Sequence, residues 1–181
     1  YHKGLSKIDG LRLSLAYPEV DPTYWITVAI IDKNTLTPWE TRYGSQNPNN
    51  DFGNSNDNDP HNFGRTMKYF TFDQNSPSQM ASFRDLIENI IPNGNYILIY
   101  TPMENRYDYW DANQPQLYQM FENMGSDSIF VGCIRPNKPF IFLTRKGDPN
   151  FVVELFCQNN EDIFLDTIIE GVPFFGYETS P

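Results

Sequence analysis

The sequence predicts an α+β domain in which two antiparallel β-sheets are layered with two amphipathic helices packed on them, a β-β-α sandwich. Three observations carry this prediction. Short β-branched and aromatic runs are separated by turn residues, two segments repeat apolar residues at helical spacing, and the order is strands, helix, strand, helix, several strands. That order suits layered sheets and helices better than a regular alternation of strand and helix. A length of 181 residues is typical of one domain.

We divide the chain into an N-terminal extension, a domain and a tail. Residues 1–24 are an extension with one strand, because the leucines of LRLSL alternate with period two. Residues 25–170 form the domain, and residues 171–181 look like a tail or linker. Within the domain, residues 44–64 read GSQNPNNDFGNSNDNDPHNFG. This insert is too polar to offset its ordering entropy by burial, so we expect a long surface loop.

The first strands surround this insert. Residues 25–31, WITVAII, are rich in β-branched residues and are followed by the turn DKN. An extended-looking run over residues 35–43 follows, and the two runs together predict a hairpin. Strand-like residues return over residues 67–72.

The clearest helix begins after Ser76. Ser76 can cap it, Pro77 suits its first position, and Gln79 completes a capping box. Apolar residues then recur at helical spacing until Pro92 ends the run; they are Met80, Phe83, Leu86, Ile87, Ile90 and Ile91. The short apolar run over residues 96–100 is typical of a central strand.

A second helix follows a polar and aromatic connector, TPMENRYDYWDANQ. Its apolar face holds Leu117, Met120, Phe121 and Met124, and Gly125 is its natural left-handed terminator.

The last third of the chain reads as strands. Residues 129–134 and 140–145 flank the turn RPNKP and predict another hairpin. Residues 151–157 form a third run, and residues 163–169 form the last strand.

Charge and hydropathy exclude two classes of partner. Lys and Arg number 13 against 23 Asp and Glu, so the net charge is −10. Such a chain repels phosphate backbones, which argues against nucleic-acid binding. No apolar run reaches the ~18 to 20 residues needed to cross a bilayer, so we expect no membrane span.

Few residues suit catalysis. A thiol nucleophile would need His2 or His61 beside Cys133 or Cys157, and both cysteines lie in apolar runs where thiols are usually inert. The two cysteines could form one bridge or remain buried thiols. Nucleotide and zinc motifs do not occur.

The carboxylates allow two further functions, glycoside hydrolysis and calcium binding. Asp108 and Asp111 could serve hydrolysis of a glycoside, although acidic residues in a connector are more often merely solvated. Asp51, Asp57 and Asp59 offer the oxygen ligands that calcium takes, without the spacing of an EF-hand. A solvated loop is the simpler interpretation, and we expect no cofactor.

Aromatic residues beside polar groups mark the candidate binding sites. The first group lies in the connector, and Trp39 with Arg42 forms the second. Flat aromatic faces beside hydrogen-bonding groups suit a sugar ring or a protein partner. The alternative is that these aromatics cover an edge of the core. The first group comprises Tyr107, Asp108, Tyr109 and Trp110.

The order of segments resembles the ILEI-like, or PANDER-like, domain. The likeness lies in ITVAIIDKNTLTP, in KYFTFDQNSPSQMASFRDLIENIIPNGNYILIYT and in LYQMFENMGSDSIFVGCIRPNKPFIFLTRKG. Gly125, Gly132 and Gly147 fall where that family places glycines. The Asn-rich insert and DANQPQLYQMFENMGSDSI look like the version of this domain embedded in Bacteroidota cell-envelope proteins similar to the gingipain-type sortase of type IX secretion.

The resemblance implies a non-catalytic module. We expect a carbohydrate or protein interaction domain of a larger extracytoplasmic envelope protein, with neighbouring domains, a glycan or an envelope protein as partners. The start at Tyr1 without a signal peptide fits an excised or processed piece. If the envelope likeness holds, the cysteine-peptidase residues lie outside this chain. A purely structural spacer is one alternative, and a small hydrolase using Cys133, or Asp108 with Asp111, is another.

Overall fold

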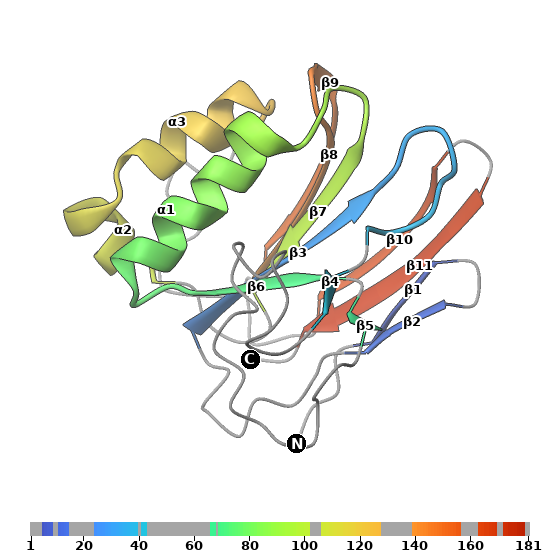
Figure 1. Cartoon of the computed structure of the whole chain (residues 1–181), viewed down its shortest axis with the longest axis horizontal. Coiled ribbons are helices and arrows are strands. Elements are labelled where there is room, and N and C mark those ends of the chain that lie inside the picture. The colour runs from blue at the N-terminus through green and yellow to red at the C-terminus, as the bar shows by residue number, and fades with distance from the viewer. Residues whose placement is uncertain are drawn as a thin grey trace.

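A computed structural model describes ten segments of the chain. They are residues 5–8, 11–14, 24–39, 41–42, 66–67, 69–101, 106–127, 139–156, 163–169 and 172–179. Within them the chain has an α+β fold, as the sequence predicts, built on a five-stranded antiparallel sheet with helices on one face (Figure 1).

The five-stranded sheet has the order β6-β3-β7-β8-β9. Its strands are β3 (Trp25–Ile31), β6 (Phe70–Asp73), β7 (Tyr96–Tyr100), β8 (Phe140–Arg145) and β9 (Asp148–Phe156). The run over residues 96–100 is central, as predicted, and all five of its residues are buried. Apolar runs of this kind form strands that are covered on both faces.

The predicted hairpin of residues 25–43 is wrong in its pairing. β3 lies between β6 and β7, and the chain after its turn touches it only through the bridge Ile31↔Pro38. Thr41–Arg42 (β4) pairs instead with Thr66–Met67 (β5). Six of the seven β3 residues are buried, and they alternate between the cores on the two faces of the sheet, so packing decides the pairing.

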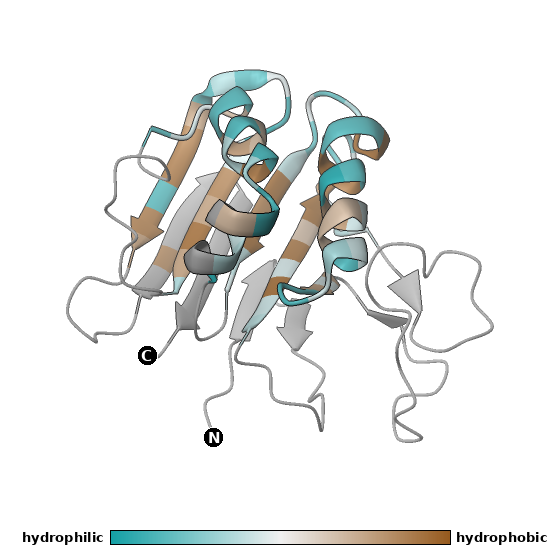
Figure 2. Ribbon diagram, turned by 90° about the vertical axis from the view of Figure 1, so that its left-hand side faces the viewer, coloured by the Kyte–Doolittle hydropathy of each residue, from teal (hydrophilic) through white to brown (hydrophobic). Residues whose placement is uncertain are grey.

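The helices cover one face of the sheet. They are α1 (Pro77–Asp85), continued by a π-helical turn (Leu86–Ile90), α2 (Tyr107–Asn113) and α3 (Gln116–Asn123). Ser76 caps α1 through the amide of Gln79, as predicted, whereas the Gln79 side chain accepts from Asp73 N instead of closing the box on Ser76. Figure 2 shows hydrophobic bands along the strands and hydrophilic residues on the outer sides of the helices.

Four more strands pair in the order β10-β11-β1-β2. They are β1 (Leu5–Ile8), β2 (Leu11–Ser14), β10 (Ile163–Ile169) and β11 (Val172–Thr179). The extension thus contains two strands where we expected one. The expected tail is also different, because β11 pairs with both β10 and β1. The predicted strand at residues 129–134 lies outside the described residues.

None of the described helices is long and apolar enough to cross a membrane.

Candidate functional site

The connector singled out in the sequence contains a short helix. We expected no regular structure between the central strand and the second helix, but residues 107–113 form α2. Of the first group, the structure describes the side chains of Tyr109 and Trp110, while those of Tyr107, Asp108 and Asp111 lie outside the description.

Trp110 is a core residue, so the prediction that it offers an exposed face to a ligand is wrong. Its side chain is 0% exposed, and its ring stacks on Phe121 at 5.9 Å between centroids. The rings of Tyr118 and Phe140 meet it edge-on at 6.1 and 6.4 Å. The helix turns this one aromatic inward, which is the alternative that the sequence left open.

The other described aromatics are half-buried. Tyr109 and Trp39 both pack against the helix-side core, and the Trp39 amide donates to the Ile30 carbonyl. Arg42 lies in β4, and its side chain is outside the description. The structure therefore does not show Trp39 and Arg42 forming one site, and their role in binding stays a prediction.

The start of α2 gathers a polar and aromatic set from three elements. We call Tyr24, Asn75 and Arg106 the Arg106 cluster. The Arg106 guanidinium lies 4.8 Å from the centroid of the Tyr24 ring, and its Nη1 donates to Asn75 Oδ1 at 2.9 Å. This geometry combines a cation–π contact with a charge-assisted hydrogen bond, which together fix the guanidinium plane.

A buried glutamine holds the cluster in place. Gln74 is fully buried, its Oε1 accepts from the Arg106 amide at 3.0 Å, and its own amide donates to the Tyr24 carbonyl at 2.9 Å. Through its side-chain oxygen and its backbone N–H, Gln74 thus joins the turn before α1 to the start of α2 and to the residue before β3. A ligand that meets these groups meets a prearranged surface.

Sequence reasoning missed Arg106 because its partners lie far away along the chain. Asn75 and Gln74 precede it by 31 and 32 positions. The available signal was an arginine directly before an aromatic run, which local patterns do not connect to the turn before α1.

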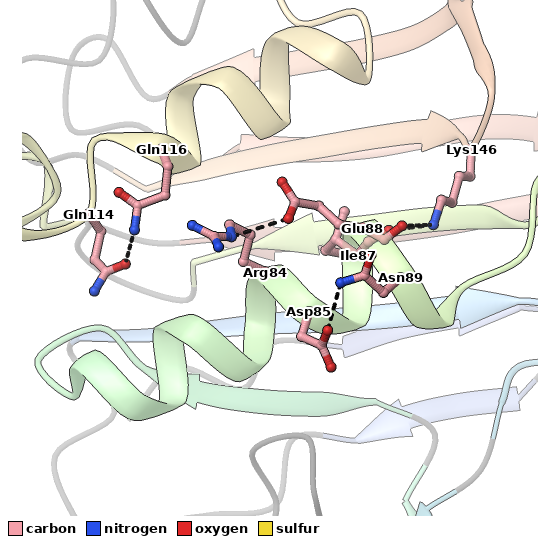
Figure 3. A network of polar contacts seen from close by, with 8 residues as sticks. All are labelled: Arg84, Asp85, Ile87, Glu88, Asn89, Gln114, Gln116 and Lys146. Atoms are coloured by element: carbon pink, nitrogen blue, oxygen red, sulfur yellow. Dashed lines mark hydrogen bonds and ion pairs between the residues drawn. The ribbon is translucent and has the colours of Figure 1, made fainter.

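A second polar surface follows the seam between α1 and α3 (Figure 3). Arg84 pairs with Glu88 at 3.2 Å, Asn89 donates to Asp85 at 2.7 Å, and Gln116 donates to Gln114 at 2.9 Å. The pairs of Arg84 with Glu88 and of Asn89 with Asp85 join residues four positions apart, so they stabilise α1 and its π-helical turn locally.

Lys146 closes one end of this surface. Its Nζ donates to the carbonyls of Ile87 and Glu88 at 2.6 and 2.9 Å, so the β8–β9 turn clamps the π-helical turn. Burial lowers the pKa of Lys146, while the carboxylate of Glu88 acts in the opposite direction. A cation at the carboxyl end of a helix also complements the helix dipole.

Two of the three glycines from the family likeness have a structural reason. Gly125 (φ +93°) ends α3, and a Cβ there would overlap the carbonyl oxygen of Pro149. Gly147 (φ +82°) forms the β8–β9 turn against Asn93. Both backbone conformations favour glycine. Gly132 lies outside the described residues.

The calcium candidates and the histidine and cysteine candidates of the sequence lie outside the described residues. They are Asp51, Asp57, Asp59, His2, His61, Cys133 and Cys157. Within the segments that the structure describes, no three His, Cys, Asp or Glu residues form a group that could hold a metal ion.

Comparison of the chain with protein-family models, curated proteins and solved structures finds no match.

Proposed function

We propose that this chain is a non-catalytic binding and assembly module of a larger extracytoplasmic protein, and that the Arg106 cluster is its ligand-contact surface. The observation that carries the proposal is the fixed guanidinium. It is half-buried, lies over an aromatic ring, and belongs to a backbone that a buried glutamine locks in place. A preorganised group loses little conformational entropy when a ligand binds.

The chemistry of the cluster favours a glycan that carries carboxylates. A planar guanidinium matches a carboxylate in two parallel hydrogen bonds, which an ammonium cannot do. The adjoining Tyr24 ring and the Asn75 amide are groups that sugars use for stacking and hydrogen bonding.

The fold that we propose for this module is the predicted β-β-α sandwich. The second face of the five-stranded sheet is a buried cluster that includes Leu165 of β10. This contact supports an arrangement in which the strands β10-β11-β1-β2 cover that face. The helices cover the other face, and the Arg106 cluster then lies at one end of the layered domain.

Titration of the chain with a uronic-acid tetrasaccharide tests the binding site. We expect amide shifts in the NMR spectrum to centre on Tyr24, Asn75 and Arg106. Arg106→Lys keeps the charge but loses the planar fork, so it should weaken binding about tenfold. Arg84→Lys on α1 is the matched control and should bind as the unchanged chain does.

Two results would reject the Arg106 cluster as the glycan site. One is equal binding by Arg106→Lys and the unchanged chain, with both equally stable in thermal unfolding. The other is the absence of binding by acidic and neutral tetrasaccharides alike. Shifts at the same residues with an envelope protein, and none with sugars, would keep the surface but change the ligand to protein.

The alternative function is that of a purely structural spacer, which binds no ligand. A spacer cut from its neighbours should expose a large apolar patch and associate. Within the described residues, Ile90 is the large apolar side chain classed as exposed, at 43%. Light scattering of the isolated chain decides between the two, because the binding module should remain monomeric.

A further inference from the structure

Two basic side chains meet at the turn before β7, which spans residues 92–95. Lys33 Nζ donates to the Asn93 carbonyl at 2.9 Å. Arg145 Nε donates to the carbonyl of the next residue, Gly94, at 3.3 Å. Because the two acceptors belong to successive residues, the ammonium and the guanidinium lie at the same turn. We call Lys33 and Arg145 the turn pair.

The backbone beneath the turn pair is fixed by hydrogen bonds between three turns. Asn95 is buried, and its Oδ1 accepts from the Lys33 amide at 3.0 Å. The Gly94 amide donates to the Lys146 carbonyl at 2.8 Å, and the Lys146 amide donates to the Asn95 carbonyl at 2.9 Å. The turn after β3, the turn before β7 and the β8–β9 turn are therefore joined, which sets the positions from which both basic side chains extend.

Arg145 is the rigid member of the turn pair, and Lys33 is the adaptable one. The Arg145 guanidinium lies 5.5 Å from the centroid of the Tyr96 ring, and this contact together with the Nε bond orients its plane. The Lys33 stem lies close to Gly94, since a Cβ at that glycine would meet Lys33 Cδ at 2.7 Å. An oriented guanidinium loses little conformational entropy when a ligand binds.

The turn pair keeps donors that a ligand can use. An ammonium has three N–H donors and a guanidinium has five. Within the part of the chain that the structure describes, each side chain donates to one carbonyl, and neither forms an ion pair with a carboxylate. Lys33 is exposed and Arg145 is half-buried. The Nη groups of Arg145 form a fork that matches two oxygens of one anion, and the ammonium adds a second positive charge.

Two carboxylates lie near the turn pair along the chain, and backbone amides of their own turns bind both. Asp32 Oδ1 accepts from the amides of Asn34 and Thr35 at 2.8 and 3.0 Å. Asp148 pairs across the β8–β9 turn with a member of the turn pair, and its Oδ1 accepts from the Asn150 amide at 3.2 Å. These carboxylates weaken the attraction for an anion, so a ligand with two negative charges fits better than one with a single charge.

Uncharged polar side chains adjoin the turn pair. Asn34 directly follows Lys33, and Asn93 supplies the carbonyl that Lys33 contacts. Both asparagines are exposed, as is Thr35. Amide and hydroxyl groups donate and accept hydrogen bonds as sugar hydroxyls do. The surroundings of the turn pair therefore favour an anion that is carried on a sugar.

We propose that the turn pair binds the phosphate group of a phosphorylated sugar. Arg145 holds two phosphate oxygens through its Nη groups, and Lys33 Nζ binds a third. The side chains of Asn34 and Asn93 bind hydroxyl groups of the sugar. A phosphate monoester carries about two negative charges at neutral pH, which matches the two cations. The inference goes beyond the proposed glycan site, because the Arg106 cluster lies at the opposite ends of β3 and β7.

The probe is glucose 6-phosphate added to the whole 181-residue chain at low salt. We expect amide shifts in the NMR spectrum to centre on Lys33, Gly94 and Arg145, and calorimetry gives the Kd. Glucose 6-sulfate has nearly the same shape but a single negative charge, so its Kd should be about fivefold higher. Glucose itself should produce no shifts at these residues.

Variants separate the contributions of charge and geometry. Lys33→Gln removes an exposed charge and should raise the Kd about fivefold. Arg145→Lys keeps its charge but loses the fork, so it should raise the Kd by a similar factor. Asp32→Asn keeps an oxygen for the turn amides and removes a negative charge, so the Kd should fall about threefold. Arg84→Gln on α1 changes the net charge as Lys33→Gln does and should leave the Kd within about twofold.

Three outcomes overturn the proposal. Equal Kd values for Lys33→Gln and the unchanged chain would show that the turn pair does not hold the phosphate. Equal Kd values for inorganic phosphate and glucose 6-phosphate would remove the sugar from the ligand. Tighter binding of a phosphoserine peptide than of glucose 6-phosphate would make a phosphorylated protein the ligand. Arg106→Lys should not alter the Kd of glucose 6-phosphate, so failure here is distinguishable from failure of the glycan site.

Discussion

The two faces of the five-stranded sheet are built from different residues. On the helix side, the described strand residues are mostly apolar, with Thr144 and Glu154 among the polar ones. The apolar ones include Ile26, Val28, Ile30, Phe70, Phe72, Ile97, Ile99, Phe140 and Phe142. The opposite face mixes Ala29, Ile31, Leu98, Ile141 and Leu143 with residues that bear hydroxyl groups. Those residues are Thr27, Tyr69, Thr71, Tyr96 and Tyr100.

The two faces therefore differ in the interactions that stabilise them. The helix side is sealed by aromatic stacking, and its one strand hydroxyl, of Thr144, donates to the Met124 carbonyl at 3.0 Å. Across the opposite face, Thr71, Thr27 and Tyr100 are direct neighbours on three strands. Burial of hydroxyls is tolerated where they find partners. The helix side should therefore be the more sensitive to loss of apolar volume, while on either face loss of a hydroxyl should lower stability only where that hydroxyl has a hydrogen-bond partner.

Trp110→Ala should give the largest effect, because it empties the centre of the helix-side core. We expect a loss of about 3–5 kcal/mol in the free energy of unfolding, measured by chemical denaturation. Trp39→Ala is the matched control, since that ring is only half-buried, and it should cost clearly less. If Trp110→Ala leaves stability unchanged but abolishes glycan binding, Trp110 is a ligand-contact residue and not part of the core, and the contrast between the two faces fails.

Gly125→Ala should come next. The residue joins the end of α3 to β9, and alanine there combines a left-handed backbone with overlap on the Pro149 carbonyl. A cost of about 2–4 kcal/mol is expected in the same measurement. Gly94→Ala shares the positive φ, but its added Cβ meets the flexible Lys33 side chain at 2.7 Å, so it should cost less. If Gly125→Ala and Gly94→Ala lower the free energy of unfolding equally, the positive φ alone explains the cost, and the close contact between Gly125 and Pro149 contributes nothing.

Lys146→Gln should have a moderate effect, because it removes the clamp between the π-helical turn and the β8–β9 turn. We expect a loss of about 1–2 kcal/mol at neutral pH. The pKa of Lys146 is lowered in the folded chain from its ordinary value of 10.5. The unfolded chain therefore binds more protons between the two pKa values, and the contribution of Lys146 to stability rises as the pH increases toward 10.5. Denaturation curves at pH 7 and pH 10 check the sign, since the cost of the substitution should be larger at pH 10.

Local signals predicted α1, α3 and the central strand. Ser76 and Pro77 set the start of α1, and Gly125 ends α3. The apolar run of β7 indicates a strand that is buried on both faces. In each case the residues that carry the signal lie within the element or directly beside it. The pairing of β3 was not predictable in this way. Its turn favours a hairpin, but the core places β6 and β7 beside it.

The connector's aromatic pattern did not single out Arg106, and the binding role of its predicted residues other than Trp110 stays a prediction. The connector does contribute Arg106 to a surface cluster, yet helix formation there turns Trp110 inward. Packing against Phe121 decides that orientation, and no pattern within the connector reveals it. The Gln74 contact that fixes Arg106 is likewise a long-range feature.

Thr27→Val tests the opposite face with the smallest expected effect. Thr27 is fully buried, and its Oγ1 has no hydrogen-bond partner among the described residues. Replacing such a hydroxyl with a methyl group of the same shape removes a desolvation penalty, so stability should rise by up to about 1 kcal/mol. Thr144→Val on the helix side is the matched control and should cost about 1–2 kcal/mol, because it leaves the Met124 carbonyl without its donor. If Thr27→Val is instead as costly as Thr144→Val, an ordered water or another polar group satisfies the Thr27 hydroxyl, and both faces then obey the same rule.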